Sequence, residues 1–383
     1  MSAARILIIA GSDSGGGAGI QADIKTVTML GGHAITAITA ITAQNTVGVQ
    51  AVHTVPAAMV IEQCRSVVSD IGIDAVKIGM IGSAETAEAV TDFLREISVP
   101  IVFDPVMVAT SGAALADART VSVFQRLMAL AHVVTPNIPE MNALGGVAPI
   151  LRHGCHLLMK GGHAEGKGTD IIDQLLSPGG QIREWCNPRI DSKNTHGTGC
   201  TLASAVACGL GQGMDVEAAV ERGIEFVRLA MHGADGLGKG HGPMAHQSVR
   251  EDAMVPGVSL NQITLPARDY RASVLFYKEL GLQQIVDSPE NGYARFEAAN
   301  GVTLSVHESD ADSSGVTIYL ESRALDKWTA QLASDGLDFD QMPQDEDWGW
   351  REARLRDPHG NVICLYQAGE NRRFPPWRMT EKK

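Results

Sequence analysis

The stretch Ile6-Leu-Ile-Ile-Ala-Gly-Ser-Asp-Ser-Gly-Gly-Gly-Ala-Gly19 begins with five apolar residues and continues into a glycine-rich turn. A short apolar run of this kind predicts a buried strand, and the glycines allow the backbone of the turn to approach a ligand closely. No P-loop GK[ST] signature follows the glycines. We interpret the stretch as the first strand and first ligand-facing turn of an α/β domain.

The same alternation of short apolar runs and helical patterns continues beyond this stretch. Further apolar runs cover residues 34–43, 74–79, 99–104, 133–135 and 157–159. Segments with apolar residues at three- and four-residue spacing lie between them, at 57–69, 84–96 and 116–130. Buried strands that alternate with helices predict a mostly parallel sheet with helices on both faces. Ligands of such folds bind beyond the carboxyl ends of the strands, so the residues after each run are the candidates for a site.

The aromatic residues are distributed unevenly along the 383-residue chain, which is long enough for two or three domains. Residues 1–250 contain 5 aromatic residues, whereas residues 251–383 contain 13. A break of this size predicts a domain boundary near residues 246–257. We therefore predict a first domain at 1–247, a linker at 248–256, a second domain at 257–371 and a C-terminal tail at 372–383.

Composition excludes several classes of protein. The formal net charge of −13 disfavours a general polyanion-binding surface, so we expect no nucleic-acid partner. No apolar run approaches the roughly 18 residues that cross a membrane, and the apolar run at the start is too short for a signal peptide. The six cysteines show no metal-type spacing, so we expect reduced, mostly buried thiols in a cytoplasmic protein.

The strongest local signal is Asn194-Thr-His-Gly-Thr-Gly-Cys200, a glycine-rich turn that leads into the alanine-rich segment 201–210. The free N–H groups at the start of such a helix favour a phosphate oxygen or a developing negative charge. Cys200 would lie at that helix start, where the pKa of a thiol falls. The alternative is a capped helix that packs tightly on the sheet and has no chemical role.

Polar and glycine-rich motifs follow the other apolar runs as well. They are AQNT at 43–46, KIGM at 77–80, DPVM at 104–107, TPNIPE at 135–140 and MKGGH at 159–163. Together with GSDSGGGAGIQAD at 11–23, KNTHGTGCT at 193–201 and GHGP at 240–243, they resemble the hydroxymethylpyrimidine/phosphomethylpyrimidine kinases of the ribokinase-like superfamily. The resemblance covers residues 4–246. It implies ATP- and Mg²⁺-dependent phosphorylation of 4-amino-5-hydroxymethyl-2-methylpyrimidine, and then of its phosphate, in thiamin biosynthesis.

The resemblance also implies roles for individual residues. The catalytic set comprises Gly197, Thr198 and Gly199 of the anion hole, Cys200 as the base and Lys160 beside the phosphate. The pyrimidine site comprises Gly11, Asp23, Gln44, Met80, Val106 and Met107, and the Gln44 amide suits the edge of an aminopyrimidine. The ATP and Mg²⁺ set comprises Asp104, Asn137, Glu140 and Thr195, with Mg²⁺ held through water. For Asp104 and Glu140 the alternative is a strand-end hydrogen bond or a helix cap.

Two other functions are compatible with the first domain. Pyridoxal kinases share the glycine loop and a similar hole, although Gln44-Asn45-Thr46, Lys160 and the cysteine of GTGC favour the pyrimidine kinase. The second alternative is a pyrimidine-binding protein without turnover. We expect a small-molecule substrate, no membrane partner and a homodimer. Only 19 residues separate Glu140 from Lys160, so we predict at most one short, proline-interrupted helical turn at 141–156.

The second domain contains an internal repeat of about 55 residues. Residues 260–282 and 316–332 each predict a strand, a turn and an amphipathic helix, and each half ends in a glycine-turned strand, at 300–307 and 357–367. The repeat, with its FYKELGL and DPHGN motifs, resembles the vicinal oxygen chelate fold of glyoxalases, dioxygenases and bleomycin-resistance proteins. That fold is a pair of βαβββ modules.

The metal ligands of that superfamily do not carry over. The corresponding positions hold Gln262, Leu304, Thr317 and Cys364, which form no coherent set of ligands for a transition metal. We therefore predict a metal-free domain, with His307 and His359 solvated. Two roles stay open for it. Trp348, Trp350, Tyr293 and Phe296 either line an apolar cleft for a flat ligand or form the core and dimer surface of a structural module.

Overall fold

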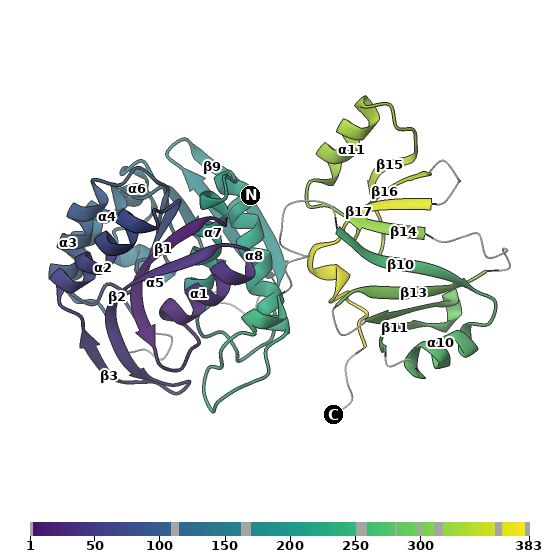
Figure 1. The fold of residues 1–383 in the computed structure, drawn as a ribbon, viewed down its shortest axis with the longest axis horizontal. Helices are drawn as coiled ribbons and strands as arrows, with labels where there is room; N and C mark the ends of the chain where they lie inside the picture. Colours follow the sequence, from purple (N-terminus) through teal and green to yellow (C-terminus); the bar gives the residue numbers. More distant parts are fainter. Residues whose placement is uncertain are drawn as a thin grey trace. The chain divides into compact units, whose positions relative to one another are not determined.

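The computed structural model describes residues 3–108, 115–161, 170–249, 259–279, 282–297, 301–309, 317–356 and 362–379. The chain divides into two compact units, Met1–Met254 and Val255–Lys383, and Figure 1 shows the elements of each. His163, His359 and most of the predicted linker lie outside the described residues. Within the described ranges, no helix is long and apolar enough to cross a membrane.

The first unit is built on a nine-stranded sheet of order β3-β2-β1-β4-β5-β6-β7-β8-β9. Its strands are β1 (Arg5–Asp13), β2 (His33–Gln44), β3 (Val49–Thr54), β4 (Ala75–Ile78), β5 (Ile101–Phe103), β6 (Val133–Val134), β7 (His156–Met159), β8 (Asp170–Ser177) and β9 (Gly180–Pro188). The six strands predicted from apolar runs pair in parallel, which confirms the predicted fold class. The antiparallel strands β3, β8 and β9 were not predicted, because most of their residues are at least partly exposed and they form no continuous apolar run.

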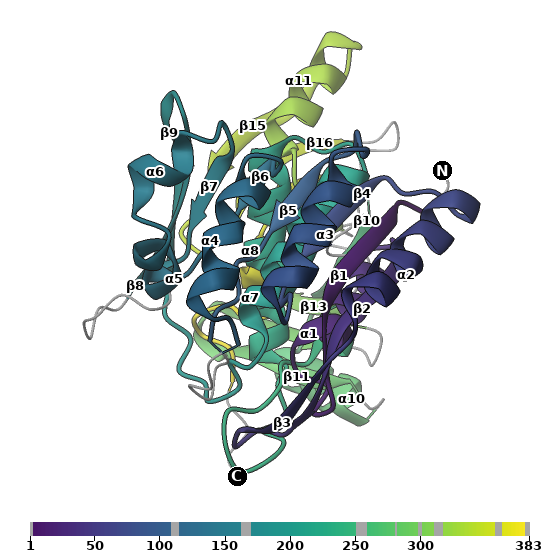
Figure 2. The same cartoon turned by 90° about the vertical axis from the view of Figure 1, so that its left-hand side faces the viewer.

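Helices cover both faces of this sheet. They are α1 (Gly19–Met29), α2 (Ala57–Asp70), α3 (Ala84–Leu94), α4 (Ala118–Met128), α5 (Ile138–Ala143), α6 (Val147–Leu151), α7 (Thr198–Gly211) and α8 (Val216–His232). Figures 1 and 2 show α2, α3 and α4 on one face and α1, α7 and α8 on the other. Small residues let α7 pack closely in this layer. A Cβ added at Gly209 would lie 2.7 Å from Ala219 Cβ, and one added at Gly211 would lie 2.7 Å from Ile6 Cδ1.

The shortened segment between Glu140 and Lys160 contains more helix than the sequence predicted. The structure has two short helices there, α5 and α6, rather than one turn at most. Pro149 is the third residue of α6, within the first turn, where a backbone N–H has no partner inside the helix. The proline therefore interrupts no hydrogen bond of α6, which is why the prediction was wrong.

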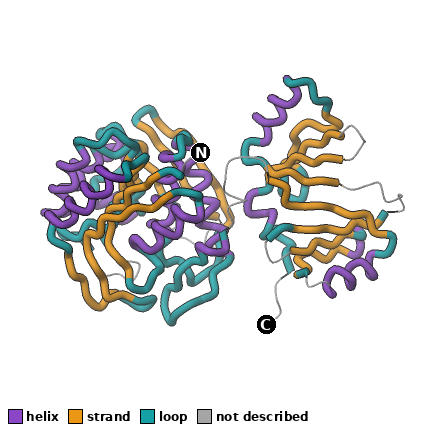
Figure 3. Tube along the Cα trace, in the orientation of Figure 1, coloured by secondary structure: helices purple, strands orange, loops and turns teal. Residues whose placement is uncertain are grey.

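The second unit is an eight-stranded sheet of order β11-β12-β13-β10-β14-β17-β16-β15. Its elements are β10 (Ser259–Ala267), α10 (Tyr270–Glu279), β11 (Gln283–Ser288), β12 (Tyr293–Glu297), β13 (Thr303–Glu308), β14 (Thr317–Glu321), α11 (Leu325–Ser334), β15 (Phe339–Asp345), β16 (Arg351–Arg356) and β17 (Val362–Gln367). Strand, helix and three strands follow one another twice, which confirms the predicted pair of βαβββ modules. The antiparallel pair β10–β14 joins the two modules (Figure 3).

The two faces of this second sheet differ in character, because alternate residues of a strand face opposite sides. One face packs against the helices, with Phe296 and Val306 beneath α10 and Leu355 and Leu365 beneath α11. The other face carries buried polar and aromatic side chains, among them Gln262, Arg295, Ser305, Glu352, Cys364 and Tyr366.

Residues 372–379, which the sequence assigned to a tail, contact the second unit. The Arg372 guanidinium is buried, with its Nε 3.3 Å from Glu321 Oε2. The Arg373 Nε lies 2.8 Å from Glu297 Oε1. This segment therefore contributes to the packing of the second unit up to Met379.

Candidate active site

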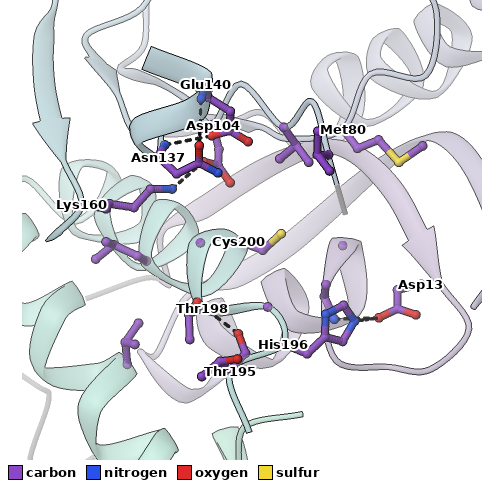
Figure 4. Close-up of a pocket in the computed structure, with 18 of the residues that line it drawn as sticks. Asp13, Met80, Asp104, Asn137, Glu140, Lys160, Thr195, His196, Thr198 and Cys200 are labelled. Atoms are coloured by element: carbon purple, nitrogen blue, oxygen red, sulfur yellow. Dashed lines mark hydrogen bonds and ion pairs between the residues drawn. The ribbon is translucent and has the colours of Figure 1, made fainter. Parts of the chain in front are cut away.

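A pocket of about 1120 Å³ lies beyond the carboxyl ends of the parallel strands of the first unit, beside the start of α7 (Figure 4). Segments from strand ends far apart in the sequence meet there, as expected for an open α/β sheet. The predicted site residues that line the pocket are Gly11, Gln44, Met80, Asp104, Val106, Met107, Asn137, Glu140, Lys160, Thr195, Gly197, Thr198, Gly199 and Cys200. Only Asp23 of the predicted set is not among the lining residues.

Asp23 is fully buried next to the pocket rather than in its wall. Its carboxylate lies 2.8 Å from Lys77 Nζ and accepts a hydrogen bond of 2.7 Å from Ser204 Oγ. Because α1 begins at Gly19, Asp23 is the fifth residue of that helix, and its side chain is on the buried face of the helix. Lys77, which the sequence did not single out, reaches the pocket instead. Burial opposes the charge of Lys77, but Asp23, Cys200 and Asp104 together outweigh burial and raise its pKa.

The backbone at the start of α7 can exist only with glycine at position 197. Gly197 has φ 87° and ψ 5°, in the left-handed region that favours glycine. A Cβ there would also lie 1.9 Å from the Gly17 carbonyl oxygen. Residues 197–200 line the pocket, and the N–H groups of Gly199 and Cys200 in the first turn of α7 have no acceptor within the helix. Thr195 lines the pocket just before this turn, with its Oγ1 3.3 Å from His241 Nδ1.

A buried ion pair lies beside this helix start. Lys160 Nζ is 3.1 Å from Asp104 Oδ1, which also accepts a hydrogen bond of 2.9 Å from Thr135 Oγ1. A Cβ added at Gly199 would lie 3.2 Å from Lys160 Nζ and 3.7 Å from Asp104 Oδ2. Burial disfavours the ammonium, but the charges of Asp104 and Glu140 raise the pKa of Lys160. A cation and the N–H groups of α7 therefore converge on one point of the pocket, which suits a phosphate group.

Asn137 and Glu140 form a capping box at the start of α5. Asn137 Oδ1 accepts a hydrogen bond of 2.8 Å from Glu140 N, and Glu140 Oε2 accepts one of 2.9 Å from Asn137 N. The helix-cap alternative therefore holds, and both residues still line the pocket. Burial, followed by the charge of Asp104, raises the pKa of Glu140 to about 7.

The carboxylates of this cluster fit only a water-mediated magnesium ion. Throughout the described part of the chain, no group of three or more His, Cys, Asp or Glu side chains converges to hold a metal. Asp104 and Glu140 supply carboxylate oxygens beside Lys160, and Asp173 also lines the pocket. Mg²⁺ keeps most of its hydration shell and is typically held by one or two carboxylates plus substrate phosphates, so this donor set is sufficient.

Cys200 does not have the lowered pKa expected at a helix start. It is the third residue of α7 and is partly exposed to the pocket. Burial has the largest effect, and with the charges of Asp23 and Asp104 it outweighs Lys77 and raises the pKa of Cys200 to about 11. The expectation from helix position alone was wrong, because burial and the charges of Asp23 and Asp104 outweigh the lowering effects of Lys77 and the Gly19 backbone.

The opposite side of the pocket carries a polar cluster that sequence reasoning missed. His196 Nε2 lies 2.9 Å from Asp13 Oδ2 (Figure 4). The same nitrogen lies 3.2 Å from Gln44 Nε2. Asp13 also accepts hydrogen bonds from three backbone N–H groups of the glycine-rich turn. Burial acts to raise the pKa of Asp13, but His196 and the backbone donors lower it. Asp13 stands in the glycine-rich motif at 11–23, and His196 stands in the motif at 193–201. Membership of these two motifs was the signal that could have identified both residues.

Apolar side chains complete this end of the pocket. Met80 and Met107 are 9% and 7% exposed. A Cβ added at Gly11 would lie 2.9 Å from Met80 Sδ, so glycine at this position leaves room for the methionine. Apolar walls beside the Gln44 amide suit a flat ring with a polar edge.

In the second unit, one of the four residues that the sequence placed at metal-ligand positions lies on the wrong face of the sheet. Gln262 and Cys364 lie on the polar face, where Gln262 Nε2 donates a hydrogen bond of 3.4 Å to Ser305 Oγ. Leu304 instead packs against the α10 side with Phe296. The interpretation of Leu304 was wrong by one residue, because its neighbour Ser305 occupies the polar face.

The aromatic side chains of the second unit do not line a common cleft. Trp350 stacks on Tyr366 with ring centroids 4.5 Å apart, and the Arg295 guanidinium lies 4.6 Å from the Trp350 ring. Phe296 packs on the opposite face of the sheet, 5.4 Å from Tyr277. Phe296 therefore cannot share a cleft with the other three aromatics, and the apolar-cleft alternative is wrong for this residue.

Comparisons with known proteins agree with this geometry. Residues 13–245 match the family described as phosphomethylpyrimidine kinase, and residues 259–365 match the glyoxalase/bleomycin resistance protein/dioxygenase superfamily. The thiamine biosynthesis bifunctional protein ThiED of Geobacter sulfurreducens is 47% identical over 265 residues, which cover 64% of this chain and 53% of that protein. The chain thus spans about half of that relative's length. The hydroxymethylpyrimidine/phosphomethylpyrimidine kinase of Streptomyces coelicolor is 46% identical over 63% of this chain and 93% of its own.

Solved structures show the same fold. The ADP complex of Bacillus subtilis pyridoxal kinase matches 65% of this chain and 99% of its own, with a TM-score of 0.60 and 30% identity. The phosphomethylpyrimidine kinase of Clostridium difficile matches 59% of this chain and 98% of its own, with a TM-score of 0.50 and 35% identity. Sequence identity is higher to the pyrimidine kinases than to the pyridoxal kinase. The chain belongs to the phosphomethylpyrimidine kinase family and carries a glyoxalase-like domain at its C-terminal end.

Proposed function

We propose that the first unit transfers a phosphoryl group from ATP to the hydroxymethyl oxygen of 4-amino-5-hydroxymethyl-2-methylpyrimidine. A second transfer to the resulting phosphate then gives the diphosphate used in thiamin biosynthesis. The observation that carries the proposal is that the two ends of one pocket differ in their chemistry. An amide and apolar side chains stand at one end, and Lys160, Asp104 and the start of α7 stand at the other.

The acceptor ring binds at the Gln44 end of the pocket. The Gln44 amide offers a donor and an acceptor side by side, which matches the ring nitrogen and amino group of an aminopyrimidine. Met80 and Met107 contact the faces of the ring, and the hydroxymethyl group extends toward Cys200. Every one of these residues lines the same pocket.

The phosphate end stabilises the group that is transferred. The N–H groups at the start of α7 and the Lys160 ammonium contact its oxygens as negative charge develops there. A bound Mg²⁺ would supply positive charge that offsets the charge of the ATP phosphates. Asp104 and Glu140 hold its water ligands, and the amide of Asn137 and the hydroxyl of Thr195 orient the phosphates.

Cys200 contacts the acceptor oxygen. With a pKa of about 11 in the free protein, the thiol is neutral at pH 7 and serves as a hydrogen-bonding partner of the hydroxyl. Lys77 lowers this pKa and so favours the thiolate, which is the form of Cys200 that takes the proton from the acceptor hydroxyl and returns to the thiol. Proton transfer by a positioned side chain typically contributes a factor of about 10² to 10⁴ in rate.

Comparison of two alcohols tests this function. We expect the full-length protein with ATP and Mg²⁺ to phosphorylate the hydroxymethylpyrimidine with a kcat/KM at least tenfold above that for pyridoxal, measured by coupled ADP release. The Lys160→Met variant is the control for contaminating kinases and should lose this activity. Faster turnover of pyridoxal would establish the competing function.

For the second unit we propose a metal-free structural module. Its polar face is occupied by its own ion pairs and stacked aromatics, such as Trp350 on Tyr366. A stoichiometric transition metal found by elemental analysis of the purified protein would contradict the proposal. We further propose that the protein is cytoplasmic, since all six cysteines are free thiols. We also propose that it forms a homodimer, which light scattering in solution tests.

A further inference from the structure

A chain of three polar side chains leads from the glycine-rich turn to the ring end of the pocket. Asp13 Oδ2 lies 2.9 Å from His196 Nε2, and the same nitrogen lies 3.2 Å from the Gln44 amide. The side chains of His196 and Asp13 are 9% and 4% exposed, so water has little access to either. A Cβ added at Gly17 would lie 2.4 Å from His196 Cδ2, so glycine at this position leaves room for the imidazole.

The proton on this histidine nitrogen is fixed by its carboxylate partner. Asp13 accepts hydrogen bonds from the backbone N–H groups of Gly15, Gly17 and Ala18 at 2.8, 3.1 and 2.8 Å, as an ionised carboxylate does. An ionised carboxylate has no hydrogen to donate. The short contact to His196 is therefore a hydrogen bond only when Nε2 carries the proton and donates it to Asp13.

A protonated Nε2 in turn fixes the orientation of the Gln44 amide. The amide atom 3.2 Å from that N–H must accept, so it is the carbonyl oxygen rather than the NH₂ group. The other amide atom then donates to Thr42 Oγ1, 3.1 Å away, and Thr42 keeps its single hydrogen for the Ser12 carbonyl at 3.0 Å. With the amide turned in the opposite sense, Thr42 would need two hydrogens. In the chosen orientation the single Nε2 hydrogen is shared between Asp13, at 2.9 Å, and the Gln44 carbonyl, at 3.2 Å, and no N–H faces another N–H.

We propose that His196, held by Asp13, is a positioning residue that fixes the Gln44 amide in the orientation that reads the aminopyrimidine edge. In this orientation one N–H and one carbonyl lone pair of Gln44 are directed to the ligand. A ring nitrogen beside an exocyclic amino group pairs with both, whereas pyridoxal has no amino group to donate. The pair Asp13–His196 therefore sets the preference for the pyrimidine. This inference rests on the proposed pyrimidine substrate.

The test compares four variants: His196→Ala, His196→Gln, Gln44→Ala and the double variant of His196→Ala with Gln44→Ala. We expect H196A to raise the KM for the hydroxymethylpyrimidine about tenfold while kcat changes less than about threefold, with little effect on the KM for pyridoxal. H196Q places an amide N–H near the position of Nε2 and should restore most of the lost affinity. The double variant should be no weaker than Q44A, because His196 acts through Gln44.

Three results would overturn the inference. They are additive effects of H196A and Q44A, an equal loss toward both alcohols, and a fall in kcat with unchanged KM. A structural role alone would produce the second or third of these.

Two further measurements separate this inference from the proposed function. Calorimetric affinity for the unphosphorylated pyrimidine without ATP does not require turnover, so a protein that binds the ring but does not phosphorylate it fails only the proposed function. The ¹⁵N spectrum of His196 in the free protein requires no ligand at all. We expect protonated Nε2, and an imidazole protonated only at Nδ1 would contradict the inference.

Discussion

Burial sets the protonation of two side chains near the phosphate end of the pocket. Cys200 and Glu140 both have raised pKa values, to about 11 and about 7, and in each case loss of solvent is the largest cause. The sequence identified both residues but predicted the wrong direction for Cys200, because a helix start is a local feature whereas burial depends on the whole site. The sequence placed Asp23 in the wall of the pocket, whereas its side chain is fully buried beside it, and this burial also depends on the whole site.

For Cys200 we expect slow alkylation at neutral pH. A thiol with a pKa near 11 is almost fully protonated at pH 7, and the thiolate is the reactive form. Iodoacetamide labelling followed by peptide mass spectrometry should show a rate at position 200 that still rises above pH 9. The exposed Cys186 provides an internal comparison. A labelling midpoint below pH 8 would contradict the effect of burial.

For Glu140 we expect a pH-dependent contribution to stability. Its pKa of about 7 in the folded protein exceeds the ordinary 4.5, so the folded state binds more protons between these values. The free energy of unfolding should therefore fall as pH rises from 4.5 to 7, by up to about 3 kcal/mol. Glu140→Gln keeps a capping acceptor but removes the titration. The free energy of unfolding of both proteins is measured by urea denaturation at several pH values in this range. An equal change with pH in the two proteins would disprove the assignment.

At the scale of elements, the predictable part of the first unit was the alternation of apolar runs and helices. Strands β1 and β2 follow from continuous apolar runs, and helices α2 and α3 follow from apolar residues at three- and four-residue spacing. The exposed hairpin of β8 and β9 has no such repeat, and its pairing depends on register with β7. Likewise, the Asp13–His196 contact joins residues 183 positions apart, which no local pattern encodes.

The turn into α7 provides a prediction at this scale. Gly197→Ala would combine a left-handed backbone with a Cβ 1.9 Å from the Gly17 carbonyl, so α7 must shift. We expect a loss of more than about 2 kcal/mol in unfolding free energy and of most turnover. Gly213→Ala is the matched control, since Gly213 has φ 83° with nothing within 4 Å of the added Cβ. It should cost only about 1 kcal/mol and leave turnover unchanged. Equal effects of the two variants would show that the close approach is unimportant.

At the scale of the whole molecule, the pocket belongs to one unit alone. Every residue that lines it falls between Ala10 and Met231, within the first compact unit. The aromatic imbalance in the sequence indicated two domains, and the structure has two compact units. Which residues lie on the polar face of the second unit depends on strand register, and the sequence assigned Leu304 to the wrong face.

We therefore expect a chain that ends at Met254 to keep kcat within about threefold of the full-length value, by coupled assay. A folded but inactive fragment, judged by circular dichroism and thermal unfolding, would show that the second unit supports the site.

The most direct test of the central claim follows the products of the reaction by ³¹P NMR. Full-length protein is incubated with ATP, Mg²⁺ and the hydroxymethylpyrimidine, with Lys160→Met in parallel. We predict that a phosphate monoester signal appears first and is then replaced by a pyrimidine diphosphate, and that neither forms with the variant. Consumption of ATP without either pyrimidine product, or equal products from the variant, would contradict the assignment of this pocket as a pyrimidine kinase site.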